Sequence, residues 1–194
     1  MKQKRIIALT GGVGSGKSRI LEVLKENYNA AVLQTDLVAK DLEEPGNPGY
    51  EAIVKAFGQE ILDDTGRVCK DAMVRMVFGD EEARKRINGL IHPLVWEFVK
   101  QWCRQSESRV TVVESALLPD NPRECFEEIW YVYTSEENRI QRLRDNRGYS
   151  TDRCRQMMER QPSEEEYRQQ ADQVIDNNGT KEDIYSQIRK IMEQ

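Results

Sequence analysis

The feature that most constrains this chain is a glycine-rich segment, Gly11–Ser18, that separates an apolar run from a helical pattern. The run Ile6–Leu9 predicts a buried strand, and apolar residues recur at helical spacing from Ile20 to Leu24. The segment reads Gly-Gly-Val-Gly-Ser-Gly-Lys-Ser, which is the G-x-x-x-x-G-K-S pattern in its strand–loop–helix context. We therefore expect an α/β core that binds a nucleoside triphosphate at the end of its first strand.

Each part of this loop has an expected task at the phosphates. Glycines let the backbone wrap closely around a polyphosphate, and the first turn of the following helix adds N–H groups and a positive dipole end. Lys17 is expected to reach the β- and γ-phosphates and to act in catalysis, and Ser18 is expected to hold Mg²⁺ through its hydroxyl. The predicted ATP-binding residues of the loop are Gly12, Val13, Gly14, Ser15, Gly16, Lys17 and Ser18.

Four further short apolar runs predict strands, and helical patterns separate them. These runs are residues 30–35, 109–114, 128–134 and 173–176. Strands that alternate with helices indicate a parallel sheet covered on both faces. The fold class expected is therefore α/β: a three-layer α/β/α phosphate-loop fold with a parallel five-stranded sheet.

Two insertions are expected in this single domain of residues 1–194. A mostly helical, acceptor-binding insert covers about residues 45–106, where Pro93 should kink a helix or start a new one. A short arginine-bearing lid covers about residues 136–170, which leaves about 1–44, 107–135 and 171–194 for the core.

Composition narrows the environment and the partners. The chain has 194 residues with 29 Lys and Arg against 34 Asp and Glu, a net charge of −5 that argues against general binding to nucleic acids or membrane surfaces. The four cysteines form no C-x-x-C pair and are expected to be reduced thiols, and no apolar stretch is long enough to span a bilayer. We expect a cytoplasmic monomer.

Two carboxylates follow predicted strands beside the phosphate loop. Asp36 and Glu114 stand where the sheet delivers side chains, so either can orient or deprotonate an acceptor hydroxyl, or bind magnesium through water. The alternative for each is a helix N-cap or a first-turn acid. Side chains alternate along a strand, so Gln34 and Asp36 are expected on one side of the second strand.

Arginines crowd the segment that follows the fourth predicted strand. We expect a mobile lid that closes over the phosphates, with Arg142 and Arg147 as the arginines chosen to contact them and about half of the arginines on a solvated charged face. Arg139 shares a helix face with Arg142. His92, the one histidine, lies within an apolar helical pattern, which favours a structural side chain over a general base.

Taken together, the motifs resemble the dephospho-coenzyme A kinase family along nearly the whole chain. The matching residues include Leu9–Ser18, Asp36 with Val38-Ala39-Lys40, Glu44-Pro45-Gly46, Phe57-Gly58, His92-Pro93, Leu117-Leu118, Arg142-Leu143 with Arg147, Gln161, and Ala171-Asp172 with Val174-Ile175-Asp176-Asn177. Members of that family are similar to nucleoside monophosphate kinases and transfer the ATP γ-phosphoryl group to the ribose 3′-hydroxyl of dephospho-coenzyme A.

The resemblance implies an enzyme with ATP and dephospho-CoA as substrates and Mg²⁺ as cofactor. It implies catalytic roles for Lys17, Asp36 and Arg142, and nucleotide contacts from Arg142, Arg147 and Asn177. The acceptor-binding residues that it implies are Asp36, Lys70, His92, Glu114 and Leu117.

This sequence departs from the family pattern on the acceptor side. Gln34 replaces the first acid of an Asp-x-Asp pair, Lys70 replaces an arginine, and the segment 114–120 lacks the usual Pro-Leu-Leu after the third strand. Two alternatives therefore stay open. One is another small-molecule or nucleotide kinase on the same scaffold, and the other is a nucleotide-dependent regulatory protein.

Overall fold

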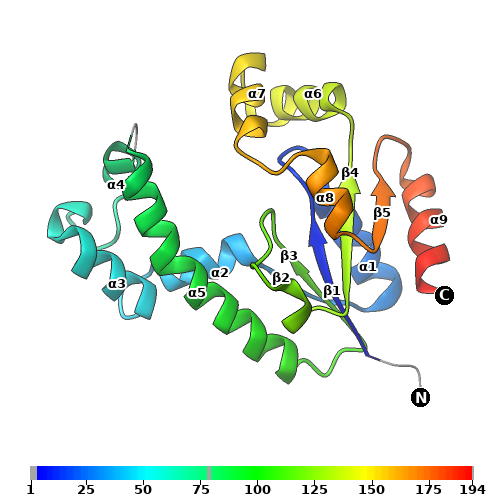
Figure 1. Cartoon of the computed structure of the whole chain (residues 1–194), viewed down its shortest axis with the longest axis horizontal. Helices are drawn as coiled ribbons and strands as arrows, with labels where there is room; N and C mark the ends of the chain where they lie inside the picture. The colour runs from blue at the N-terminus through cyan, green and yellow to red at the C-terminus, as the bar shows by residue number, and fades with distance from the viewer. Residues whose placement is uncertain (1–3, 78–79, 194) are drawn as a thin grey trace. The chain divides into compact units, whose positions relative to one another are not determined.

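The computed structural model describes residues 4–77 and 80–193 as two compact units. One unit combines the stretch that ends at Leu33 with the stretch that begins at Ser106, and the other is Gln34–Gln105. Figure 1 shows strands and helices alternating in the first unit, whereas the second consists of helices.

A five-stranded sheet organises the first unit. Its strands are β1 (Arg5–Thr10), β2 (Ala31–Gln34), β3 (Val110–Glu114), β4 (Glu128–Tyr133) and β5 (Gln173–Asp176), in the order β2-β3-β1-β4-β5 (Figure 1). Strand β1 lies parallel to β3 and to β4, and β4 lies parallel to β5. The prediction of a parallel α/β sheet is confirmed.

Local capping explains where most helices around this sheet begin. They are α1 (Lys17–Tyr28), α6 (Glu136–Arg147), α7 (Thr151–Glu159), α8 (Glu164–Gln170) and α9 (Lys181–Met192), with a 3₁₀ turn η2 at Pro122–Glu124. In α6, α7, α8 and α9 a Ser or Thr hydroxyl at the N-cap accepts a backbone N–H of the first turn, which satisfies a donor that has no partner within the helix.

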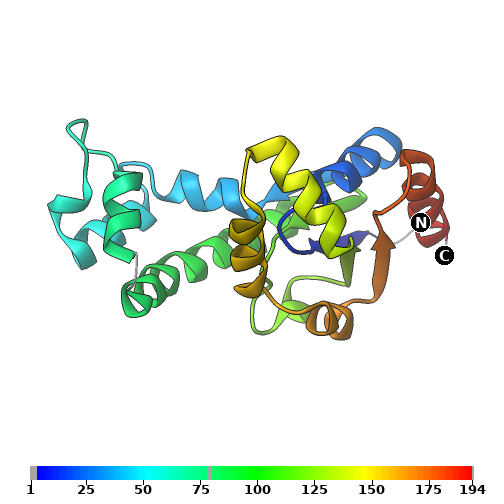
Figure 2. The same cartoon turned by 90° about the horizontal axis from the view of Figure 1, so that it is seen from above.

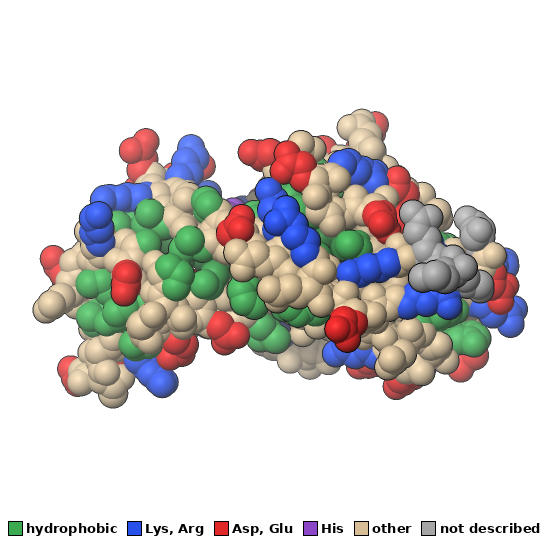
Figure 3. Space-filling model, turned by 90° about the horizontal axis from the view of Figure 1, so that it is seen from below, with side chains coloured by type: hydrophobic (Ala, Val, Ile, Leu, Met, Phe, Trp, Pro, Cys, Tyr) green, Lys and Arg blue, Asp and Glu red, His purple; other side chains and the backbone are tan. Residues whose placement is uncertain are grey.

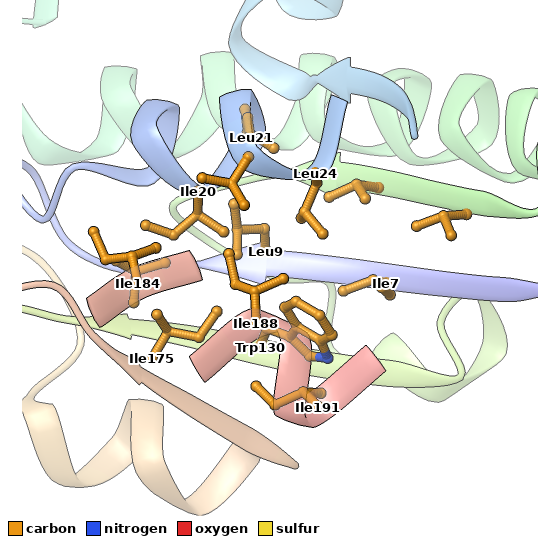
Figure 4. Close-up of a cluster of buried hydrophobic side chains, with 14 residues drawn as sticks. Ile7, Leu9, Ile20, Leu21, Leu24, Trp130, Ile175, Ile184, Ile188 and Ile191 are labelled. Carbon is orange, nitrogen blue, oxygen red and sulfur yellow. The ribbon is translucent and has the colours of Figure 1, made fainter. Parts of the chain in front are cut away.

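The main core lies between one sheet face and the helices α1 and α9 (Figure 4). Ile7 and Leu9 of β1 belong to one cluster with Ile20 of α1 and with Ile184 and Ile188 of α9. These five side chains are fully buried. Burial of one such side chain contributes about 1.5–3 kcal/mol, so this layer fixes the strand that carries the phosphate loop.

An aromatic pair covers the opposite sheet face. Tyr131 of β4 stacks on Tyr167 of α8, with ring centroids 4.9 Å apart and an interplanar angle of 7°. The Tyr167 hydroxyl donates to the Ala116 carbonyl at 3.0 Å, and burial raises the pKa of Tyr167 to about 12. Helices therefore lie on both faces, as the three-layer prediction requires.

The second unit is built around one long helix. Helix α5 (Glu81–Gln105) packs against α2 (Thr35–Leu42), α3 (Pro48–Phe57) and α4 (Lys70–Val77), and a 3₁₀ turn η1 spans Gln59–Ile61. Pro93 lies inside α5, so the expectation that it starts a new helix is wrong. Proline removes one backbone donor, and the packing of Ile87, Ile91 and Val95 keeps the helix continuous around it.

Charged and hydrophobic side chains share the face that Figure 3 draws. Figure 3 shows Lys and Arg side chains interspersed with Asp and Glu on the face that it draws. Among the helices within residues 4–77 and 80–193, none combines the length and the apolar character needed to cross a membrane.

Candidate phosphoryl-transfer site

The phosphate loop leaves β1 and enters α1 with the backbone that its glycines allow. Gly14 has φ 77° and Gly16, the N-cap of α1, has φ 83°. Residues other than glycine are strained in this left-handed region of backbone conformation. At Gly16 an added Cβ would also overlap the Asn177 side-chain amide. Glycine at both positions therefore lets the loop close while its neighbours approach it.

The side chain of Lys17 contacts the start of this loop. Its Nζ donates to the Gly11 carbonyl at 2.8 Å and lies 3.3 Å from Glu114 Oε1. The two side chains are only 13% and 14% exposed. In the register of the sheet Glu114 is the partner of Leu9, so the end of β3 brings this carboxylate beside the loop. The structure thus brings together two of the residues singled out in the sequence.

The segments that follow β4 and β5 bind the loop at Ser15 through hydrogen bonds. The Ser15 carbonyl accepts from Asn177 Nδ2 at 2.7 Å, Thr134 Oγ1 at 2.9 Å and Arg142 Nη1 at 3.1 Å. Arg142 Nη2 also donates to the Asn177 carbonyl at 2.6 Å. Burial, and secondarily the neighbouring Arg19, lowers the pKa of Arg142. Arg142 and Asn177 therefore buttress the loop backbone in this structure.

The other end of the loop is held by the lid segment. Arg139 Nε donates to the Val13 carbonyl at 2.9 Å, and the Val13 N–H donates to Gln161 Oε1 at 2.8 Å. Arg139 Nη2 donates to the same Gln161 oxygen at 3.2 Å. Burial lowers the pKa of the Arg139 guanidinium. Figure 2 shows α6, which carries Arg139, next to the loop that follows β1.

The hydroxyl of Ser15 is buried inside the loop. Ser15 is 1% exposed, and its Oγ is the one buried side-chain polar atom without a hydrogen-bond partner within residues 4–77 and 80–193. An orphaned polar atom is costly, and a bound ligand or water satisfies it. Together with the N–H groups and positive end of α1, the loop is suited to bind a polyphosphate.

Three predicted acceptor residues, Asp36, Lys70 and His92, belong to the second unit. Helix α2 begins at Thr35 directly after β2, so Asp36 is an exposed residue of the first helical turn and Gln34 is the N-cap. The expectation that both side chains share one side of a strand is therefore wrong. Lys70 is the first residue of α4, and its side chain lies outside the described part.

His92 lies on the exposed side of α5. The expectation of a structural histidine inside the apolar stripe is wrong, because the buried positions Ile91 and Val95 define a stripe that passes beside residue 92. An exposed imidazole remains accessible to a ligand.

A cavity of about 410 Å³ opens beyond the carboxyl ends of β1 and β3 in the first unit. It is lined by Thr10, Ala116, Leu117, Leu118, Pro119, Asp120, Pro122, Pro162, Tyr167 and Gln170. Leu117 is 47% exposed, although it is one of the large hydrophobic side chains. The volume of this cavity is within the range of small-molecule sites, which are about 300–1,000 Å³.

Sequence reasoning selected some lid residues and missed others. It chose Arg142, which contacts the loop, and Arg147, which ends α6 with an exposed side chain. It assigned no role to Arg139 or Gln161, although both bind the loop. The three-residue spacing between Arg139 and Arg142 was the available signal. Gln161 follows α7 and carries no periodic signal.

Comparisons with protein families and characterised sequences point to one family. The dephospho-CoA kinase family model matches residues 5–183. A dephospho-CoA kinase of Shouchella clausii is 33% identical over 186 residues, which cover 94% of this chain and 94% of that protein. A dephospho-CoA kinase of Arabidopsis thaliana is 34% identical over 194 residues, which cover 97% of this chain and 82% of that protein.

Solved structures support the same fold. A Thermus thermophilus protein named TT1252 superposes with a TM-score of 0.83 at 27% identity, covering 99% of this chain and 97% of that one. Dephospho-CoA kinase from Campylobacter jejuni has a TM-score of 0.63 at 20% identity, with coverage of 98% and 96%. A shikimate kinase from Acinetobacter baumannii, with a TM-score of 0.57 at 17% identity and coverage of 98% and 93%, shares the fold alone.

Proposed function

We propose that this chain, which belongs to the dephospho-CoA kinase family, transfers the γ-phosphoryl group of ATP to the ribose 3′-hydroxyl of dephospho-CoA. The product is coenzyme A, so the reaction is the last step of coenzyme A biosynthesis. The observation that carries the proposal is the family match over residues 5–183, which includes the ordered phosphate loop. Phosphoryl transfer needs positioning and charge stabilisation more than covalent chemistry, and this loop supplies both.

On the donor side, residues 12–18 bind ATP through backbone N–H groups, and Lys17 neutralises charge on the β- and γ-phosphates. Lys17 Nζ now donates to the Gly11 carbonyl, so it needs only a local movement to meet a phosphate. Arg142 and Asn177 keep the loop in its binding shape through Ser15. Arg147, exposed at the end of α6, approaches the nucleotide as the lid of residues 136–170 closes.

Mg²⁺ is proposed as the cofactor, held at Ser18. This residue is exposed in the first turn of α1, where its hydroxyl can act as a ligand beside the bound phosphates. Among the described residues, no group of three or more His, Cys, Asp or Glu is placed to hold a metal ion. A single hydroxyl ligand such as that of Ser18 fits Mg²⁺, which commonly keeps water and substrate oxygens as its other ligands. When bound, the ion neutralises the charge that develops on the phosphates.

On the acceptor side, we assign Asp36 to orient the 3′-hydroxyl and to accept its proton. The helical segment of about residues 45–106 binds the rest of dephospho-CoA, with Lys70 and His92 as contacts. Glu114 and Leu117 contribute from the core, about residues 1–44, 107–135 and 171–194. The cavity beside Leu117 supports this assignment, because it opens at the carboxyl ends of parallel strands, where ligands of such sheets bind.

We propose further that the enzyme works in the cytoplasm as a monomer and binds neither nucleic acid nor a membrane. The net charge of −5 supports the last two points, since both partners are polyanions.

The direct test is to incubate the protein with magnesium and ATP in the presence of dephospho-CoA. We expect coenzyme A and ADP in equal amounts, and no transfer to a dephospho-CoA analogue that lacks the 3′-hydroxyl. Shikimate serves as a second acceptor control, since shikimate kinases share this fold. Transfer to a different acceptor would support another small-molecule kinase, and nucleotide hydrolysis without transfer to any metabolite would support a regulatory protein.

A further inference from the structure

The residues around Val13 form a small site that is already filled by the protein itself. Gln161 Oε1 accepts from the Val13 N–H at 2.8 Å and from Arg139 Nη2 at 3.2 Å. A backbone N–H and a guanidinium N–H that converge on one oxygen are the donors that phosphate oxygens prefer. The carboxamide oxygen of Gln161 is thus a neutral occupant of an anion-binding position inside the phosphate loop.

The loop geometry indicates which phosphate this position serves. Lys17 reaches the β- and γ-phosphates in this motif, and its Nζ lies at the Gly11 carbonyl, at the start of the loop. The γ end of the triphosphate therefore lies near Gly11 to Val13. Arg142 and Asn177 contact Ser15 at the far end of the loop. Of the two arginines, Arg139 is the one at the γ end.

Glycine at residue 12 allows the side chains of Arg139 and Gln161 to lie against the loop backbone. A Cβ at residue 12 would overlap the Arg139 guanidinium and would lie 2.9 Å from Gln161 Oε1. The two lid side chains thus lie directly on the loop backbone, and a bound γ-phosphoryl oxygen and the Gln161 oxygen exclude each other.

We propose that Gln161 is a latch that holds the γ-phosphoryl site in the nucleotide-free protein, and that ATP displaces it so that Arg139 binds the transferred phosphoryl group. Arg139 is then a catalytic residue, and Gln161 is a positioning residue that keeps Arg139 beside the loop until the triphosphate arrives. The inference rests on the proposed kinase function only for the role of Arg139 in transfer. Displacement of Gln161 needs nucleotide binding alone.

Calorimetric titration without acceptor tests the latch, with the β,γ-imido analogue of ATP and with ADP, both with magnesium. Gln161→Ala should bind the triphosphate analogue roughly two- to tenfold more tightly or better, since the two hydrogen bonds that Gln161 Oε1 accepts no longer have to be broken. Gln161→Glu should bind it more weakly, because a carboxylate binds Arg139 and the Val13 N–H more strongly. ADP affinity should stay unchanged in both variants. Gln141→Ala is the matched control, since the Gln141 amide donates to Asp145 on α6.

Equal changes for ADP and for the triphosphate analogue, or no change for either, would overturn the latch. Lost stability cannot mimic the expected result, because it would weaken binding in both variants and would not make Gln161→Ala bind more tightly.

The role of Arg139 is tested by the rate of coenzyme A formation. Arg139→Ala should lower kcat on the order of 10³-fold, as expected for an arginine that stabilises the transferred phosphoryl group, and should weaken the triphosphate analogue but not ADP. Arg139→Lys should recover part of that affinity, and Arg144→Ala, an exposed arginine of the same helix, should match the parent. Unchanged kcat in Arg139→Ala would refute the catalytic role. If the parent protein made no coenzyme A, the proposed function would fail while the calorimetric test of the latch still stood.

Discussion

The phosphate loop and the helical unit Gln34–Gln105 present their functional candidates in different ways. Around the loop, the carbonyl oxygens of Val13 and Ser15 accept hydrogen bonds from side chains of other segments, and the Gly11 carbonyl accepts one from Lys17 of the loop itself. In the helical unit, Asp36 and His92 are exposed on helix surfaces. The loop is organised by hydrogen bonds within the protein, whereas the groups proposed for the acceptor are exposed to solvent.

This difference has a physical cause. A triphosphate brings several negative charges, and a preorganised set of dipoles and cations binds it without reorganisation at the moment of reaction. An exposed carboxylate such as Asp36 is hydrated, and in the proposed function the acceptor has to replace that water. Substitutions on the two sides should therefore affect ATP affinity and turnover differently.

The largest effect is expected at Lys17. Lys17→Ala should lower kcat about 10²- to 10³-fold or more, because charge that develops on the phosphates loses its neighbouring cation. The fold should persist, with a lower melting temperature because Glu114 loses its ion-pair partner. Lys25→Ala, on the exposed side of the same helix, is the reference for losing a surface lysine. Steady-state kinetics and a thermal melt measure both. Near-normal turnover with an unchanged melting curve would refute the assignment of the loop.

On the acceptor side, Asp36→Asn should lower kcat at least about tenfold, a barrier change of roughly 1.4 kcal/mol or more, with little change in ATP affinity. Gln34→Asp should be neutral or mildly activating. The decisive comparison is Glu114→Gln, because Glu114 is the other candidate base and lies 3.3 Å from Lys17 of the phosphate loop. If Asp36→Asn were as fast as the parent and Glu114→Gln were inactive, the base would be Glu114 and Asp36 a residue of the first helical turn.

Arg142→Ala should have an intermediate effect that combines activity with stability. Its guanidinium binds the carbonyls of Ser15 and Asn177, so its loss should lower kcat and kcat/KM together and should also lower the melting temperature. Hydrogen bonds of a charged group contribute about 1.5–3 kcal/mol, which sets the expected loss of stability. A fall in stability with unchanged kinetics would make Arg142 a structural residue alone.

The smallest effect is expected at Tyr167, in the wall of the cavity. Tyr167→Phe removes the hydrogen bond to Ala116 and should destabilise the protein by about 0.5–1.5 kcal/mol. Since the folded-state pKa of Tyr167 is raised to about 12, its contribution is complete below pH 10 and is lost as pH rises from 10 towards 12. Urea denaturation at pH 8 and pH 11 should show a smaller alkaline loss in Tyr167→Phe. An identical loss in both proteins would contradict the assignment.

Much of the fold could be predicted because its signals are local. Short apolar runs, separated by helical patterns, predicted all five strands. Strand β5 has the predicted bounds, residues 173–176. Helix α8 was missed as a separate element, because seven mostly charged residues carry no apolar periodicity and their helix depends on the capping box of Ser163 and Glu166. The unbroken course of α5 through Pro93 depends on packing, which overrides the local cost of proline.

The sequence by itself determined the phosphate loop, its strand and helix, and the family, because glycines, a lysine and a serine at fixed spacing leave few other structures. Only the tertiary structure decided which distant groups meet the loop. Glu114 reaches Lys17 through the register of β3 on β1, and Gln161 reaches Val13 across 148 positions of sequence. Such contacts depend on strand order and on the path of the lid, and neither leaves a periodic trace in the residues concerned.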